Sequence, residues 1–328
     1  MKKIKVTSIG GGSGQFALLS SLRDIKNLDI SSVVSMVDSG GSTGRLRDEL
    51  GILPPGDVLK CLLALSPNRE SARKLLQARF KSNKKLKGHN AGNMLLSVLS
   101  QYSGSFSDGI EALGEILNIK GRVLPVTTNR ATLVAELSNG ERIFGEAAID
   151  IPRGDQREKI VKTFLSPHHT SEIKAHPPVI DYIKNADYVI VGPGDIYTSI
   201  IPNFLVPGVK EAIKESRAKI IYITNIMTKF GESDSFEIKD FVDLVEETIG
   251  QKINMVVQNE RRPEDKVLNL YKEQKAFFVS PIEKKDKKTK YIKTDILDDS
   301  EQIIRHDKQK LAKILEKILN NKYENSNI

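Results

Sequence analysis

The stretch SIGGGSGQFALLSSLR, residues 8–23, decides the fold of the first part of the chain. The segment KIKVTSI before the glycines is apolar, rich in β-branched residues and as long as a strand. After the glycines, apolar side chains repeat with helical spacing at Phe16, Leu18, Leu19 and Leu22. The order strand, glycine turn, helix is the opening unit of an α/β fold.

This glycine turn has two interpretations. Gly12, Gly14 and Ala17 match the G-x-G-x-x-A pattern of a dinucleotide-binding turn, and Asp38 stands where an acid would meet a ribose hydroxyl. Successive glycines leave backbone amides free to face an anion, and the following helix adds its positive N-terminal end. The alternative is that the glycines only allow a tight passage from strand to helix.

Similar turns follow other predicted strands. DSGGSTG (38–44) follows SSVVSMV, GPGDIYTS (192–199) follows YVIV, and the strand in IIYITNIMT offers Asn225 and Thr228. The carboxyl ends of parallel strands share one edge, where open sheets bind ligands, so we expect these turns to converge. Together they suit a phosphate flanked by hydroxyl-rich groups. A serine hydrolase is not indicated, because the chain has no G-x-S-x-G elbow.

The rest of the chain alternates predicted strands and helices. Helices are expected at 57–66, 70–80, 90–102, 107–117, 207–216, 239–250, 262–274 and 307–322, with further strands at 253–259 and 276–280. Residues 132–149 alternate around Asn139-Gly140, which predicts a β-hairpin with a type I′ turn. We therefore expect an α/β, Rossmann-like, three-layer and mainly parallel sheet in one domain, residues 1–328, with a helical and β-hairpin insertion at approximately 66–176.

Composition narrows the class of protein. The chain has 328 residues, 39% of them hydrophobic, and its only cysteine, Cys61, excludes an internal disulfide framework. Neither a signal peptide nor an apolar run of about 18 residues is present, which predicts a cytoplasmic protein without a membrane span.

The formal net charge of +8 raises the question of nucleic-acid binding. Many lysines fall in two runs, 81–88 and 283–290, while aromatic residues make up 6% of the chain and tryptophan is absent. Such runs are typical of solvated loops, and stacking platforms for bases are scarce. The charge therefore favours a small anionic ligand over a nucleic acid.

Five motifs together carry a resemblance: IGGGSG, VDSGGSTGRLRDELGILPPGD, GHNAGN, GPGDIYTSIIPNFLVPGV and NIMTKFGE. In this order they are similar to the gluconeogenesis-factor family, a branch of the 2-phospho-L-lactate transferase-like (CofD-like) superfamily. The similarity covers residues 4 to about 260 and, more weakly, the tail to Leu319. It implies a Rossmann-like core that binds a UDP-sugar such as UDP-N-acetylglucosamine. It also implies a regulator of gluconeogenic growth, cell-envelope synthesis and cell shape, whose surface binds a partner protein.

The transferase relatives imply an alternative, the joining of phospholactate to a deazaflavin precursor with magnesium. Their motif after the second strand carries paired acids, whereas this chain has Asp38 followed by Ser39. Loss of one carboxylate weakens a magnesium site. We therefore favour a binding protein without a required cofactor or metal over an enzyme; Mg²⁺ belongs only to the transferase alternative. NAD-linked redox chemistry is a third alternative, without an identifiable hydride-transfer constellation. Whether the chain turns over a substrate or forms a homodimer stays open.

The residues expected to contact the ligand are Gly10, Gly11, Gly12, Ser13, Gly14, Asp38, Gly40, Gly41, Ser42, Thr43, Asp57, His89, Asn90, Asn93, Gly192, Pro193, Gly194, Tyr197, Asn203, Asn225, Thr228, Tyr271 and Arg305. Glycine amides would hold phosphate, Asp38 would accept from a ligand hydroxyl, and Ser42 and Thr43 would donate to phosphate. The resemblance implies the roles of Tyr271 and Arg305.

Several of these residues have a structural alternative. Asp57 could be the N-cap of its helix, and Asn90 could cap the helix that carries Asn93. His89 could be a structural histidine, and Tyr271 could pack against its own helix instead of stacking on a base.

Overall fold

A computed structural model describes residues 2–37, 53–80, 88–168, 172–283, 288–298, 300 and 302–320. Its main feature is a sheet of seven parallel strands in the order β10-β9-β8-β7-β1-β2-β3. The strands are β1 (Ile4–Gly10), β2 (Leu28–Val34), β3 (Arg122–Pro125), β7 (Tyr188–Val191), β8 (Lys219–Ile223), β9 (Met255–Asn259) and β10 (Lys290–Thr294). The parallel α/β prediction is confirmed.

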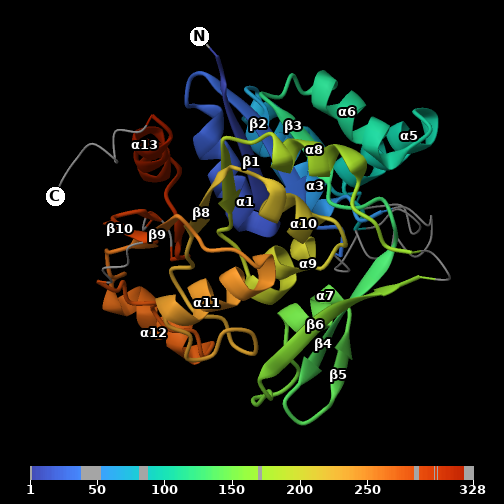
Figure 1. Ribbon diagram of the computed structural model, residues 1–328. Helices are drawn as coiled ribbons and strands as arrows, with labels where there is room; N and C mark the ends of the chain where they lie inside the picture. Colours follow the sequence, from blue (N-terminus) through green and yellow to red (C-terminus); the bar gives the residue numbers. More distant parts are fainter. Residues whose placement is uncertain are drawn as a thin grey trace.

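Helices flank this sheet (Figure 1). They are α1 (Gly12–Arg23), α3 (Gly56–Leu65), α4 (Arg69–Leu76), α5 (Ala91–Tyr102), α6 (Phe106–Ile116), α7 (Glu146–Asp150), α8 (Pro177–Lys184), α9 (Ile201–Phe204), α10 (Val209–Glu215), α11 (Ile238–Ile249), α12 (Asp265–Glu273) and α13 (Lys308–Leu319), with a π-helical turn at Ile196–Ile200. Helix α1 packs against α3 and α13, while α10 packs against α8 and α11. Each predicted helix is present, displaced by a few residues at its ends.

The order of strands places a topological switch point between β1 and β7. From β1 the chain moves to β2 and β3 on one side, and from β7 it moves to β8, β9 and β10 on the other. The strands at this point are fully covered: Val189, Ile190 and Val191 have no exposed surface. In such sheets the crevice beyond the carboxyl ends of the two central strands is the usual ligand site.

A second, smaller sheet contains β4 (Ala131–Leu137), β5 (Arg142–Phe144) and β6 (Ile160–Pro167) in the order β5-β4-β6. Figure 1 shows it projecting from the main body, below the helices α9 and α10. The β4–β5 hairpin was predicted, but its turn is not type I′. That type needs positive φ at both central residues, and only Gly140, at φ 85°, has it. The predicted insertion at 66–176 also includes β3 of the main sheet.

Two further expectations need correction or addition. Residues 276–280 were predicted as a short strand, yet only Phe278 makes a bridge, to Met227. The edge strand β10 and the small pair β11 (Leu297–Asp298) and β12 (Arg305–His306) were not foreseen. Within the described ranges, no helix is both long and apolar enough to cross a lipid bilayer.

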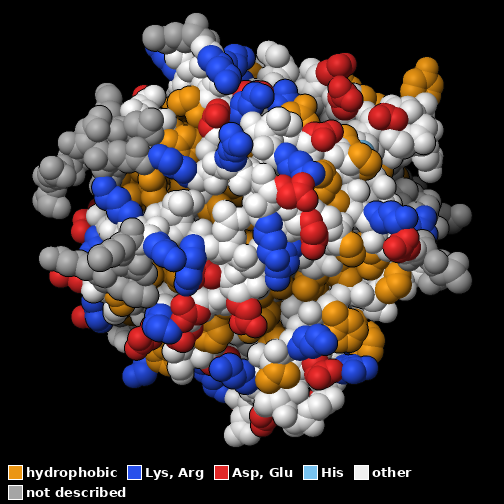
Figure 2. Space-filling view, in the orientation of Figure 1, with side chains coloured by type: hydrophobic (Ala, Val, Ile, Leu, Met, Phe, Trp, Pro, Cys, Tyr) orange, Lys and Arg blue, Asp and Glu red, His pale blue; other side chains and the backbone are white. Residues whose placement is uncertain are grey.

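Basic and acidic side chains alternate over the face shown in Figure 2 instead of gathering in one continuous basic area. The lysine runs at 81–88 and 283–290 lie partly outside the described residues. The prediction that nucleic acid is not a partner stays a prediction.

Candidate functional site

A cavity of about 840 Å³ opens at the switch point, beyond the carboxyl ends of the central strands. Its wall is assembled from the turns after β1, β7 and β8, from α12, and from the segment that carries β12 and the start of α13. The volume lies in the range of small-molecule sites in proteins. The cavity is therefore the candidate ligand site, and we call it the switch-point pocket.

The turn after β1 presents backbone N–H groups to this pocket. Gly12, at φ 65°, adopts a conformation that favours glycine, and its N–H donates to Asp57 Oδ2 at 2.8 Å. The N–H groups of Ser13 and Gly14, which also line the pocket, have no partner among the described residues. Helix α1 starts here without an acidic residue in its first turn. Two free donors at a helix N-terminus make this turn suitable for an anion.

The turn after β7 lies directly against the turn after β1. A Cβ atom on Gly14 would come within 2.2 Å of the Pro193 carbonyl oxygen, and one on Gly194 would come within 3.6 Å of the Gly11 carbonyl oxygen. Gly192, at φ 71°, and Gly194, at φ 158°, both have positive φ. The glycines thus serve both interpretations offered by the sequence, since they let two turns meet and leave amides beside the pocket.

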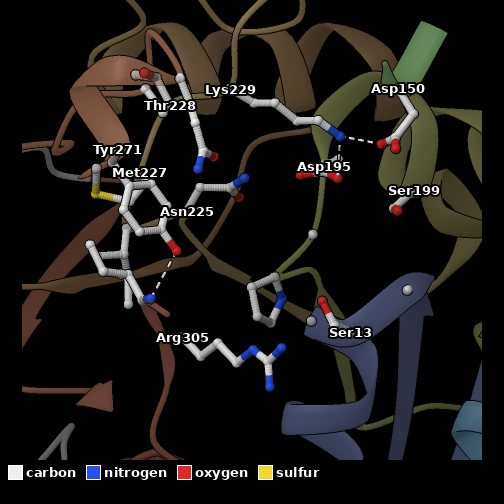
Figure 3. A pocket seen from close by; sticks show the side chains of 18 of the residues that line it. Ser13, Asp150, Asp195, Ser199, Asn225, Met227, Thr228, Lys229, Tyr271 and Arg305 are labelled. Atoms are coloured by element: carbon white, nitrogen blue, oxygen red, sulfur yellow. Dashed lines mark hydrogen bonds and ion pairs between the residues drawn. The ribbon is translucent and has the colours of Figure 1, made fainter. Parts of the chain in front are cut away.

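A second wall of the pocket comes from the turn after β8 and from α12. Tyr271 points its hydroxyl at the backbone of Ile304 and accepts a hydrogen bond from that N–H at 2.9 Å (Figure 3). Thr228 accepts from the Phe277 N–H at 2.9 Å. The buried side-chain oxygen Oδ1 of Asn225 has no hydrogen-bond partner. A ligand donor would satisfy that oxygen, so Asn225 is a candidate recognition residue.

Arg305 belongs to β12 and lies on the lower side of the pocket in Figure 3, near Ser13. The strand that carries it is anchored by its neighbour His306, whose Nε2 lies 3.0 Å from the Thr224 carbonyl oxygen. Burial lowers the pKa of His306 to about 4, so this ring is neutral at physiological pH. Of these two neighbours in β12, only Arg305 is positively charged.

Lys229 lies at the centre of a group of carboxylates on a third wall. Its Nζ pairs with Asp150, with Asp195 at 2.7 Å and with Glu232 at 3.0 Å (Figure 3 draws the first two). Glu232 is 4% exposed, and its oxygens also accept from the Tyr197 N–H at 3.1 Å and the Thr198 hydroxyl at 3.2 Å. Burial alone would lower the pKa of Lys229, but the three carboxylates outweigh it and raise that pKa. The ammonium stays charged and ties α7, the β7 turn and the β8 turn together.

Burial raises the pKa of Glu232 from 4.5 to about 7, although Lys229 pulls it down; Asp195 adds to the rise. Between these two pH values the folded protein binds more protons than the unfolded chain. The contribution of Glu232 to the free energy of unfolding is therefore greatest below pH 4.5. We expect the free energy of unfolding to fall as the pH rises from about 4.5 to about 7 and to level off above that. Denaturant unfolding from pH 5 to 8 measures this slope, and Glu232→Gln should flatten it. An unchanged slope in that variant would assign the effect to another group.

The predicted site residues fall into three sets. Those that line the switch-point pocket are Gly11, Gly12, Ser13, Gly14, Pro193, Gly194, Asn225, Thr228, Tyr271 and Arg305. Asp38, Gly40, Gly41, Ser42 and Thr43 lie outside the described residues. Gly10, Asp57, His89, Asn90, Asn93, Gly192, Tyr197 and Asn203 are described but do not line the pocket.

Some members of the third set act on the pocket indirectly. Asp57 is not the N-cap of α3, because the cap position is Pro55. Its carboxylate instead accepts from the Gly12 N–H and, at 2.8 Å, from Lys60 Nζ. Asn203 is fully buried and donates to the Ser199 carbonyl oxygen at 2.9 Å. These two residues hold the β1 turn and the segment after β7.

Other members of this set cap a helix or are buried away from the pocket. Asn90 caps α5, as one of its two interpretations predicted, and accepts from the Asn93 N–H at 2.6 Å. His89 and Asn93 are buried, 2% and 1% exposed. The hydroxyl of Tyr197 points to the Ile160 carbonyl oxygen, 3.5 Å away, and so reaches the second sheet.

The pocket also contains residues that the sequence did not single out: Arg73, Asp150, Lys229 and Lys308. Isolated charged residues outside glycine motifs give no periodic or spacing signal. Among these four residues, Lys229 alone could have been found from the sequence, because it lies inside the NIMTKFGE motif.

The fold and the site define an α/β protein of Rossmann type with a ligand pocket at its switch point. Residues 6–297 match the model of the family described as 2-phospho-L-lactate transferase CofD, and the chain belongs to this family. It is 41% identical to a putative gluconeogenesis factor of Thermotoga maritima, over 96% of this chain and 99% of that one. It is 35% identical to the gluconeogenesis factor of Bacillus subtilis, over 97% and 99%. A crystal structure of a Bacillus halodurans protein superposes with a TM-score of 0.88 at 34% identity, covering 97% of this chain and 100% of that one.

Proposed function

We propose that the protein binds a sugar nucleotide of the UDP-N-acetylglucosamine type. As a ligand-responsive regulator it would serve gluconeogenic growth, cell-envelope synthesis and cell shape. The observation that carries the proposal is the meeting of two glycine turns at the switch point, with the Ser13 and Gly14 amides unpaired beside Arg305. Free amides, a helix N-terminus and a guanidinium together suit a diphosphate.

The other walls suit the remaining parts of such a ligand. Asp150 and Asp195, each paired with Lys229, line the pocket and keep exposed surface on their side chains, 31% and 39%. Carboxylates of this kind accept hydrogen bonds from sugar hydroxyls. On the opposite side, Tyr271 and the unpaired oxygen of Asn225 offer a ring and an acceptor for a base (Figure 3). The diphosphate would lie between these two ends.

Transferase chemistry, the alternative, implies a bound magnesium ion. Asp150, Asp195 and Glu232 have carboxylate oxygens within 4.8 Å of one another, the spacing of a metal site. The Lys229 ammonium already pairs with all three and would have to leave before an ion could enter. As arranged, these residues do not fit magnesium, and we favour a regulatory role; the relatives are named gluconeogenesis factors, which agrees with a link to gluconeogenic growth.

Calorimetric titration with UDP-N-acetylglucosamine, NAD and GTP, each with and without magnesium, tests this proposal. We expect binding of the UDP-sugar that does not depend on magnesium. Arg305→Gln should weaken it about 10- to 100-fold, because one charged hydrogen bond is worth about 1.5–3 kcal/mol. Arg217→Gln, at an exposed arginine outside the pocket, is the matched control.

Other outcomes would decide against the proposal. Turnover of a deazaflavin acceptor that requires magnesium would establish the transferase alternative. Tighter binding of NAD than of the UDP-sugar would favour redox chemistry. Equal affinity in the parent protein and Arg305→Gln would place the site elsewhere.

A further inference from the structure

Cationic side chains from three elements meet beside α1, next to the glycine turn. They are Arg69 and Arg73 of α4, Arg305 of β12 and Lys308 at the start of α13. Arg73, Arg305 and Lys308 line the switch-point pocket, and Arg69 lines a smaller hollow of about 210 Å³. We call these four residues the cation cluster.

The ring of Phe16 fixes the position of this cluster relative to the glycine turn. Lys308 Nζ lies 5.0 Å from the ring centroid and the Arg69 guanidinium carbon lies 5.9 Å from it. Phe16 follows Ser13 by three residues in α1, so the two lie on the same side of the helix, about 4.5 Å apart along its axis. The cluster is therefore the immediate neighbour of the free amides at the helix N-terminus.

The charges of the cluster are poorly balanced within the described structure. Burial lowers the pKa of Lys308, and repulsion from Arg69, Arg73 and Arg305 lowers it further, while the Asp298 carboxylate raises it. That carboxylate already accepts from the Ser300 hydroxyl at 2.6 Å and from its N–H at 3.0 Å. Arg73 donates to a neutral partner, the Gln77 side chain, at 3.0 Å. An anion placed among these cations would relieve the repulsion.

We propose that Arg73 and Lys308, together with Arg305, form a second phosphate subsite beside the glycine turn, so that the pocket selects nucleoside diphosphates over monophosphates. This inference rests on the proposed function, because it divides the diphosphate between two positions. One phosphate lies on the Ser13 and Gly14 amides, and the other lies among the cations one helical turn away. A monophosphate fills only one of the two positions and leaves the other empty.

The test compares the dissociation constants of UDP and UMP, measured by calorimetry at one fixed salt concentration, in the parent protein and in Lys308→Gln and Arg73→Gln. We expect the parent to prefer UDP by about tenfold or more. Each variant should lose about tenfold in affinity for UDP, with UMP changing less than about twofold. Lys310→Gln is the control. That lysine belongs to the same helix but pairs with Asp295 at 2.9 Å and does not line the pocket.

Inorganic phosphate and pyrophosphate give a second readout that needs no base. Stabilisation of the parent by pyrophosphate, reduced in both variants, without binding of any uridine nucleotide, would support the subsite and overturn the proposed sugar-nucleotide function. The same ratio of UDP to UMP affinity in the parent and both variants would overturn the subsite and leave the proposed function standing. No response to either anion or to either nucleotide would overturn both.

Discussion

The variant Gly14→Ala is expected to lower the free energy of unfolding by about 3 kcal/mol and to abolish nucleotide binding. Alanine normally stabilises a helix relative to glycine by about 1 kcal/mol, whereas here we expect alanine to destabilise the protein. The reason is the 2.2 Å that would separate its Cβ from the Pro193 carbonyl oxygen. Because the obstacle is backbone, the turns after β1 and β7 must move apart, at the upper end of the cost of overpacking.

Urea unfolding followed by circular dichroism measures the first effect, and calorimetry measures the second. Gly114→Ala is the matched control, since Gly114 also lies within a helix, α6. Its added Cβ would come closest to the end of the Ile119 side chain, at 3.0 Å, and would meet Leu62 at 3.7 Å, an ordinary contact distance. We expect that control to change stability by about 1 kcal/mol or less. A Gly14→Ala protein as stable as its parent would contradict the close approach of the two turns.

The second large effect is expected for Lys229→Met. Removal of the ammonium leaves Glu232, which is 4% exposed, without its cation and next to Asp195. Breaking a buried ion pair in this way costs about 3–5 kcal/mol at neutral pH. Loss of Lys229 also removes the charge that pulls the pKa of Glu232 down, so this carboxyl takes up a proton on folding. The loss of stability should therefore shrink as the pH falls from 8 to 5.

Unfolding by urea at pH 5 and pH 8 checks this expectation. Lys239→Met is the comparison, because Lys239 forms an exposed pair with Asp243 and its loss should leave the stability almost unchanged at both pH values. The double variant Lys229→Met/Glu232→Gln should recover part of the loss at pH 8. A deficit that is equal at both pH values would show that the packing of the lysine stem, and not its charge, stabilises this region.

The glycine turns after β1 and β7, and the strands before them, could be predicted from the sequence, because their signals are local. A β-branched run followed by glycines marks the carboxyl end of a strand, and parallel pairing brings such ends to one edge. Gly14 and Pro193 therefore meet as expected, although 179 positions separate them. The prediction of a type I′ turn was wrong, because the dipeptide Asn139-Gly140 does not fix the length of the loop. The loop between β4 and β5 has four residues, and only Gly140 in it has a positive φ.

The charged walls of the pocket could not be predicted in this way. The group around Lys229 brings together residues 150, 195, 229 and 232, and the cation cluster brings together residues 69, 73, 305 and 308. Charged residues are common on surfaces, and their spacing along the chain says nothing about tertiary neighbours. Asp57 shows the same limit, since its partner Gly12 lies 45 residues away.

The switch-point pocket joins α1, near the start of the sequence, to β12 and α13 near residue 319. During synthesis, all seven parallel strands from β1 to β10 are made before Arg305 and Lys308. A growing chain can thus assemble most of its sheet while its pocket still lacks its cationic side. Because α13 also buries Leu311, Leu315 and Ile318 in the core, a chain that stops before residue 305 should lack both Arg305 and Lys308 of the pocket and the helix that covers α1.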